Sequence, residues 1–296
     1  MAAGLITYMD GSRREDLLDV VTNVSPAETP LLSGLPMGGK AMQTLHEYTT
    51  DTFANSADNA QIEGADFSAV DLTQPTRSNN VTQIARKNIL ISGTEEVVDG
   101  VVSVTAYQTN KGVKEHAKDI ELAYMAGSRA SGSSGVGRRM TGVINALTTN
   151  ASTRASGSSL GEVAFNDIMN LIYDSTNEVA TEVYCGATLK RDISGFTAGS
   201  TKNVMADEKR LINAVAIYES DFGIHKIFLH RDVPNGANAK MLVAINPEYH
   251  RQSWLRPTFV KALASTGDSE RKMIISEGTL EHRGEATGAA ISGFTA

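Results

Sequence analysis

Apolar residues recur at helical spacing in several stretches of the chain, and the longest stretch covers residues 104–126. Its apolar positions follow the spacing i, i+4, i+7 and i+11: Val113, Ala117, Ile120 and Tyr124. Lysines and glutamates occupy the other faces, so the pattern predicts a long helix that lies along a sheet or a neighbouring element. A second helix is predicted over 162–174, with Ser159 and Glu162 at the spacing of a capping box, and shorter helices are predicted over 12–24 and 187–193.

Strand-like patterns fill much of the remaining chain. Valine and isoleucine return with partial alternation over 81–91, and five further strands are predicted in the second half: 214–218, 224–230, 241–245, 272–275 and 278–282. We find no repeat at a fixed period. Helices and strands are mixed without regular alternation, so the sequence predicts an α+β fold.

Two stretches lack such patterns. Residues 36–80 show no sustained 3.6-residue period and consist mostly of small and polar residues. An excursion of this length with so few apolar residues is normally functional or disordered when it occurs in a compact domain. The second stretch, 127–139, is rich in Gly and Ser, which ends the long helix and predicts a flexible hinge with two exposed arginines, Arg138 and Arg139.

Charge is distributed unevenly along the 296 residues. The whole chain has 27 Lys and Arg against 34 Asp and Glu, a net charge of −7. Residues 1–35 hold 2 basic and 5 acidic residues, residues 36–80 hold 2 and 6, and the remainder holds 23 of each. We interpret this as an extended, water-facing N-terminal portion on a neutral body, and an ordinary acidic subdomain is the alternative. The negative net charge argues against a dedicated nucleic-acid-binding protein.

Other whole-chain features narrow the class of protein. The single cysteine, Cys185, cannot form an internal disulfide. No stretch approaches the ~18 consecutive apolar residues of a membrane-spanning helix, and the first residues lack the pattern of a secretory signal. The sequence therefore predicts a soluble protein that is made in the cytoplasm and has no membrane contact.

No motif in the sequence meets the requirements of a catalytic, phosphate-binding or metal site. Residues 157–161 match G-x-S-x-G with Ser159 as the nucleophile, but the preceding residues do not look like the strand that a serine hydrolase requires. Residues 135–142 resemble a phosphate-binding loop only superficially, because they lack the G-K-[ST] ending. None of the six histidines lies at metal-ligand spacing. We therefore predict no catalytic residue, no cofactor and no metal, and keep a serine hydrolase using Ser159 as the alternative from another class.

Several segments, taken in order, resemble the major capsid proteins of tailed bacteriophages, whose coat fold is shared with encapsulin nanocompartments. The resemblance covers nearly the whole chain. The segments that carry it are ETPLLSGLPMGGKA, the loop around Asn59 and Glu63–Asp66, TRSNNVTQIARKNILISGTEE, KDIELAYMAG, GVGRRMTGVINAL, YESDFGIHKIFLHRDVP and SEGTLEHRGEATGAAISG. Unlike relatives with a long N-terminal scaffolding extension, this chain starts almost directly with the arm, so we expect a separate scaffolding protein or none.

The resemblance implies a division of the chain. Residues 1–35 would be the N-arm, and 36–80 the extended E-loop that lies across a neighbouring subunit. Residues 81–139 would form the P-domain strand, the long spine helix and the Gly/Ser-rich joint. Residues 140–246 would be mainly the A-domain, and 247–296 would return as strands to the P-domain.

The resemblance also implies function, contacts and partners. The chain would assemble without enzymatic activity into hexamers and pentamers of an icosahedral phage head, around double-stranded DNA bound without sequence specificity. Separate scaffolding, portal and decoration proteins are possible partners, and assembly would take place in the host cytoplasm. An encapsulin-like shell is the nearest alternative.

Inter-subunit contacts are expected at the loop residues Lys40, Glu47, Glu63, Asp66 and Arg77, with Arg138 and Arg139 at the joint beside the spine helix. Lys40 is the only lysine of the loop, and nothing around it indicates reactivity, so we expect non-covalent assembly.

Overall fold

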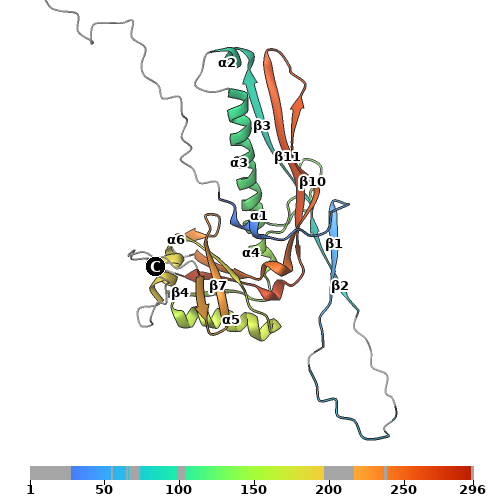
Figure 1. Ribbon diagram of the computed structural model, residues 1–296, viewed down its shortest axis with the longest axis vertical. Coiled ribbons are helices and arrows are strands. Elements are labelled where there is room, and N and C mark those ends of the chain that lie inside the picture. Colours follow the sequence, from blue (N-terminus) through green and yellow to red (C-terminus); the bar gives the residue numbers. More distant parts are fainter. Residues whose placement is uncertain are drawn as a thin grey trace, which may run out of the picture.

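Two β-sheets organise the computed structural model, which describes residues 28–54, 56–64, 66, 74–98, 104–196, 217–236 and 239–294. One sheet is long and three-stranded, with a helix along it, and the other is seven-stranded and flanked by helices (Figure 1). A two-stranded ribbon leaves the molecule near the junction of the two sheets and continues into a long loop (Figure 1).

The three-stranded sheet is antiparallel, in the order β10-β11-β3. Strands β10 (His250–Leu263) and β11 (Ser269–His282) form a hairpin, and β3 (Gln83–Ser92) pairs with the other edge of β11. The short helix α2 (Gly93–Val97) precedes the long helix α3 (Val104–Ala126), which lies against one face of this sheet (Figure 1). Gly112 allows the close approach, since a Cβ at this position would lie only 2.9 Å from Cδ1 of Ile274.

The seven-stranded sheet combines segments from distant parts of the chain. Its order is β4-β12-β9-β5-β7-β6, and β8 pairs with β9. Its strands are β4 (Ala151–Ser158), β5 (Glu182–Cys185), β6 (Ile217–Ser220), β7 (Gly223–Leu229), β8 (Asn235–Gly236), β9 (Ala239–Ile245) and β12 (Ala289–Phe294). Two short 3₁₀ helices, η3 (Pro247–Tyr249) and η4 (Glu285–Thr287), lie at the ends of the β10–β11 hairpin.

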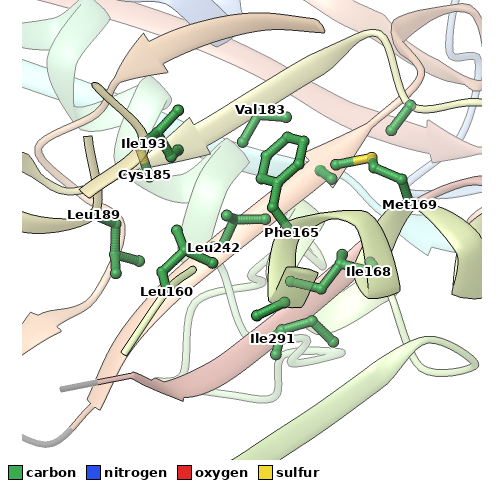
Figure 2. Close-up of a cluster of buried hydrophobic side chains, with 14 of the residues drawn as sticks. Leu160, Phe165, Ile168, Met169, Val183, Cys185, Leu189, Ile193, Leu242 and Ile291 are labelled. Carbon is green, nitrogen blue, oxygen red and sulfur yellow. The ribbon is translucent and has the colours of Figure 1, made fainter. Parts of the chain in front are cut away.

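Helices α5 (Glu162–Thr176) and α6 (Ala187–Gly195) contribute to the hydrophobic core on one face of this sheet. Phe165, Ile168 and Met169 of α5 point toward Val183 and Leu242 of the strands (Figure 2). The helix ends at Asn177, whose left-handed conformation (φ 56°) lets its N–H reach the carbonyl of Tyr173. This one-sided packing explains why the apolar period of 162–174 could be read from the sequence.

A second core joins the two sheets. On the opposite face of the seven-stranded sheet, Tyr184 and Val243 pack with Leu31 of α1 (Pro30–Gly34), Tyr124 of α3 and Val143 of α4 (Val143–Ala146). The C-terminal end of α3 is therefore buried against the other sheet, while its N-terminal half lies on the three-stranded sheet. This shared core makes α3 the connection between the two bodies.

The remaining element is the ribbon. Strands β1 (Leu45–Thr50) and β2 (Thr76–Val81) pair in antiparallel register from Leu45 opposite Val81 to Thr50 opposite Thr76. The loop between them projects away from the three-stranded sheet (Figure 1).

Several sequence predictions are confirmed. The fold is α+β. The long helix has the predicted ends, and the helices predicted over 162–174 and 187–193 are α5 and α6. The helix predicted over 12–24 lies outside the described residues, as do residues 214–216 of the strand that includes β6.

Other predictions are wrong in detail. Val113 is exposed, and Gly112 and His116 are buried in its place, because close packing on the sheet selects a small residue and a hydrogen-bonding one. Ser159 does not cap α5, whose N-cap is Gly161. Segment 127–139 is a folded hairpin with bridges between Ala130 and Arg139 and between Ser133 and Val136, in place of the predicted hinge.

Most differences between the prediction and the structure concern the strands. The sequence did not predict β4, β5, β10 and β12, and the predicted strands 272–275 and 278–282 are parts of the single strand β11. Strand β11 continues through Gly278, which pairs with Trp254 on one side and Gln83 on the other. The ring of Trp254 occupies the space that a Cβ at position 278 would need. Of the segment 247–296, β10 and β11 belong to the three-stranded sheet, whereas β12 pairs with β9 and β4 in the seven-stranded sheet.

Candidate assembly interface

The loop between β1 and β2 exposes acidic and apolar side chains together. Residues 51–66 contain Asp51, Asp58, Glu63 and Asp66 and no lysine or arginine. Phe53 is fully exposed, and Ile62 is 83% exposed. Large apolar side chains in such positions stabilise a protein only when another surface covers them.

The root of this loop is fixed to the body by polar contacts. His46 Nε2 lies 3.0 Å from Oε1 of the buried Glu281, and the Tyr48 hydroxyl accepts a 3.0 Å hydrogen bond from the backbone N–H of His282. Burial raises the pKa of Tyr48, so its hydroxyl stays protonated. For Glu281, burial by itself would raise the pKa, but hydrogen bonds from Ser253, His46 and Arg283 outweigh burial and hold the pKa below its usual value. The ribbon therefore leaves the body in a defined direction.

The predicted loop residues lie at the surface, in different places. Glu47 and Arg77 form an exposed ion pair across the ribbon, with 3.4 Å between Arg77 Nη1 and Glu47 Oε2. Lys40 is exposed ahead of β1, and Glu63 and Asp66 are exposed in the loop. Of the predicted loop residues, Glu47 and Arg77 are thus brought together within one chain.

The two joint arginines have different surroundings. Arg138 Nη2 lies 2.7 Å from Oε1 of the buried Glu277, and its Nε donates to the carbonyl of Thr82. Arg256 binds the other carboxylate oxygen of Glu277 at 2.8 Å. Arg138 is therefore held within its own chain, and its predicted exposure is wrong, while Arg139 is exposed.

A second surface lies on the face of the three-stranded sheet opposite α3. Residues that pair directly across strands share a face, and Ile274 faces α3, so the alternate residues face away from the helix. The exposed apolar side chains on this face are Ile84, Leu90, Phe259 and Leu263. A cavity of about 430 Å³ lies beside them, between Ile84 and the hairpin residues Val136 and Arg138.

The same face is basic. Arg86, Lys261 and Arg271 lie on it, and Arg138 and Arg256 share the single acid Glu277. Among the described residues, Arg271 Nε is buried without a hydrogen-bond partner. The sequence did not reveal this surface, because β10 was not predicted and the pairing of β3 with β11 joins residues that are far apart in the chain.

The G-x-S-x-G motif has a different context from the one expected. β4 ends at Ser158 and α5 begins at Glu162, so a strand does precede the helix. Ser159 is exposed, and within the described part of the chain no histidine forms a hydrogen bond with it. A nucleophilic serine requires such a base, so the geometry gives no support to a hydrolase here.

Neither a metal site nor a membrane-spanning helix is found among the described residues. The described ranges contain no group of three or more His, Cys, Asp or Glu side chains that could hold a metal ion. None of their helices is long and apolar enough to cross a membrane.

Comparisons with known proteins agree on one kind of fold. The chain resembles the capsid of a native GTA particle (TM-score 0.67, 12% identity, 98% of this chain and 97% of the other) and the Microbacterium phage Oxtober96 protein (TM-score 0.66, 14% identity, 94% and 95%). It also resembles the holo-SrpI encapsulin complex of Synechococcus elongatus PCC 7942 (TM-score 0.60, 6% identity, 96% and 93%). At these identities the likeness establishes the fold alone.

Sequence comparison gives the family. The chain is 28% identical over 127 residues to the major capsid protein of Escherichia phage Phieco32, a match that spans 41% of this chain and only 35% of that protein. The sequence pattern of the family described as SU10 major capsid protein matches residues 5–295. The chain therefore belongs to the SU10 major capsid protein family.

Proposed function

We propose that this chain is the shell subunit of an icosahedral phage head, in which its copies form hexamers and pentamers around double-stranded DNA. Family membership and the shared fold support this proposal. In this assignment residues 1–35 are the arm, 36–80 the E-loop, 81–139 with β10 and β11 the P-domain, and 140–246 with β12 the A-domain.

One observation carries the proposal: the chain bears two exposed surfaces of opposite charge. The loop 51–66 has four acids and the exposed Phe53 and Ile62. The outer face of the three-stranded sheet has exposed apolar residues among arginines and a lysine. The loop projects away from the sheet of its own chain (Figure 1). The loop of one copy therefore binds the sheet of another copy, where the opposite charges complement each other. Multiple modest contacts of this kind suit a closed symmetric shell.

The predicted contact residues keep roles in this proposal. Glu63 and Asp66 belong to the acidic loop, and Lys40 and Arg139 lie at exposed positions near its root and at the joint. Glu47 and Arg77 pair across the ribbon at its surface. Arg138 acts indirectly, because its guanidinium is bound to Glu277.

Charge reversal tests the contact. A variant with Asp58→Lys and Glu63→Lys, and another with Arg86→Glu and Lys261→Glu, should each remain folded and fail to form shells, because like charges then face each other. Both reversals in one chain should restore shells that electron microscopy detects. Shells from either half-reversed variant would contradict the proposed contact, and absence of shells from the unchanged protein would contradict the proposed function.

The contents of the particles and the bonds between their subunits test the other parts of the proposal. We propose that the particles hold DNA, and that an electrically balanced body avoids binding it tightly. Purified particles with protein cargo and no nucleic acid would favour an encapsulin-like shell instead. We also propose non-covalent assembly in the host cytoplasm, with a separate scaffolding protein or none and with portal and decoration proteins as further partners. Because no covalent bond joins the subunits in this proposal, boiling in detergent should release a single 31.5 kDa chain.

A further inference from the structure

Three acidic side chains are buried among the residues that the structure describes. Glu121 is 1% exposed, Glu277 is 4% exposed and Glu281 is 1% exposed. A buried carboxylate is costly unless hydrogen bonds and opposite charges compensate for lost hydration. Each of the three therefore needs a specific set of partners.

Glu121 binds the C-terminal end of the arm, which we call the arm root. Its Oε1 accepts hydrogen bonds from the Leu31 N–H at 2.8 Å and from His230 Nε2 at 2.8 Å, and its Oε2 accepts from the Leu32 N–H at 2.7 Å. One carboxylate of α3 thus holds the first turn of α1 and the end of β7. Without it, these two backbone N–H groups would have no partner inside the first helical turn.

Glu281 binds the root of the loop. Its Oε1 lies 3.0 Å from His46 Nε2 and 2.5 Å from Ser253 Oγ, and its Oε2 lies 2.6 Å from Arg283 Nη2. His46 belongs to β1, Ser253 belongs to β10, and Arg283 directly follows β11. The contact therefore ties the ribbon to the three-stranded sheet.

Glu277 binds the joint. Besides Arg138 and Arg256, it accepts a 3.1 Å hydrogen bond from Thr82 Oγ1, at the corner between β2 and β3. The hairpin 127–139 and this corner are therefore held at one point.

All three glutamates share one pattern, in which a carboxylate on α3 or β11 holds an element that leaves the body.

Apolar contacts could not fix the directions of these elements in the same way. The hydrophobic effect is non-directional, whereas a carboxylate with two or three donors fixes the angle at which each donor approaches. We propose that Glu121, Glu281 and Glu277 are positioning residues for assembly, which set the directions of the arm root, the loop and the joint respectively. This inference rests on the proposed function.

Three single variants test it: Glu121→Gln, Glu281→Gln and Glu277→Gln. Glutamine keeps the size of the side chain but replaces one acceptor oxygen by a donor group. Glu115→Gln, a partly exposed position on α3, is the matched control. Hydrogen exchange of the unassembled subunits and the yield of shells are measured for all four variants and for the unchanged chain.

We expect hydrogen exchange to rise only near the partners of each substituted glutamate. Exchange should rise by about tenfold or more near residues 31–35 in Glu121→Gln, near 45–50 in Glu281→Gln, and near 82 and 130–139 in Glu277→Gln, as loss of a charge-assisted hydrogen bond implies. Exchange in the α5 core should stay unchanged, and shells should be lost in all three variants but not in the control.

Two outcomes would overturn the inference. A rise in exchange over the whole chain would mean that the glutamates only stabilise the fold, and normal shells from the three variants would mean that they do not direct assembly. If Glu281→Gln or Glu277→Gln does not fold, removal of the donor by His46→Ala or Arg138→Ala takes its place, with the same expected pattern. If Glu121→Gln does not fold, His230→Ala takes its place, and exchange should rise near residue 230, because the Leu31 and Leu32 N–H groups keep their acceptor. Failure of the unchanged chain to form shells would instead contradict the proposed function.

Discussion

The Nδ1 atoms of His250 and His282 lie 3.0 Å apart inside the protein, at the junction of β10, β11 and the loop root. A hydrogen bond between them requires that one ring be neutral and accept. Burial lowers the pKa of His250 to about 3, and the neighbouring His282 adds to this, while burial lowers the pKa of His282 to about 4. Both rings are therefore neutral in the folded protein at neutral pH.

This pair predicts an acid-sensitive subunit. The unfolded chain takes up these protons near pH 6.5, before the folded chain does, so the free energy of unfolding should fall as the pH drops from about 6.5 to 4. Each histidine should contribute about 1.4 kcal/mol per pH unit in this range. His250→Phe should reduce the slope by that amount in urea titrations of the unassembled subunit. Burial also lowers the pKa of His116 and His225, and these two histidines contribute equally to the slope of both proteins. An unchanged slope would contradict the assignment.

Phe165 should be a sensitive position of the α5 core. Its ring is fully buried and meets Tyr218 edge-on with 5.2 Å between ring centroids. Phe165→Ala should lower the free energy of unfolding by about 3–5 kcal/mol, since it removes apolar contacts and leaves a cavity. The exposed neighbour Val163 provides the control, because Val163→Ala should change stability by less than about 0.5 kcal/mol. Equal effects of the two substitutions would refute this view of the core.

Gly142 should tolerate no side chain. A Cβ there would lie 2.6 Å from the backbone nitrogen of Gly127, and 2.7 and 2.8 Å from the carbonyl oxygens of Ala123 and Tyr124. Gly142→Ala should therefore push the start of α4 away from the end of α3 and cost about 1–3 kcal/mol or more in thermal unfolding. Gly137→Ala, with no atom near its Cβ, should cost far less. A stable Gly142→Ala variant would contradict this packing.

Cys185 should be unreactive in the folded subunit. Its side chain is fully buried, and burial raises the pKa of the thiol to about 12. Because the thiolate is the reacting form, a thiol reagent at pH 8 should modify the native protein far more slowly than the same chain in guanidinium. Rapid labelling of the folded protein would show that β5 opens to solvent.

Periodic patterns explain what could be predicted. The ends of α3, the apolar side of α5 and the strand around Ile89 follow from local spacing, because each of these elements buries one face. β10 could not be predicted in this way, since its outer half is exposed and it is held by pairing with β11. Glu121 gave only a weak signal, an acid among apolar residues in the segment IELAYM.

The sequence by itself determined the mixed class of fold, the long helix and the acidic, thinly apolar loop, because composition and short-range period are local properties. Only the tertiary structure decided that Arg138 is held by Glu277, that Glu47 pairs with Arg77, and that β3 and β11 place basic and apolar residues on one surface. These relationships depend on strand register between distant segments. Glu277, for example, lies 139 residues from Arg138 and 195 residues from Thr82 in the chain. No local pattern encodes such a register, because many alternative pairings bury equally apolar faces until the whole chain has folded.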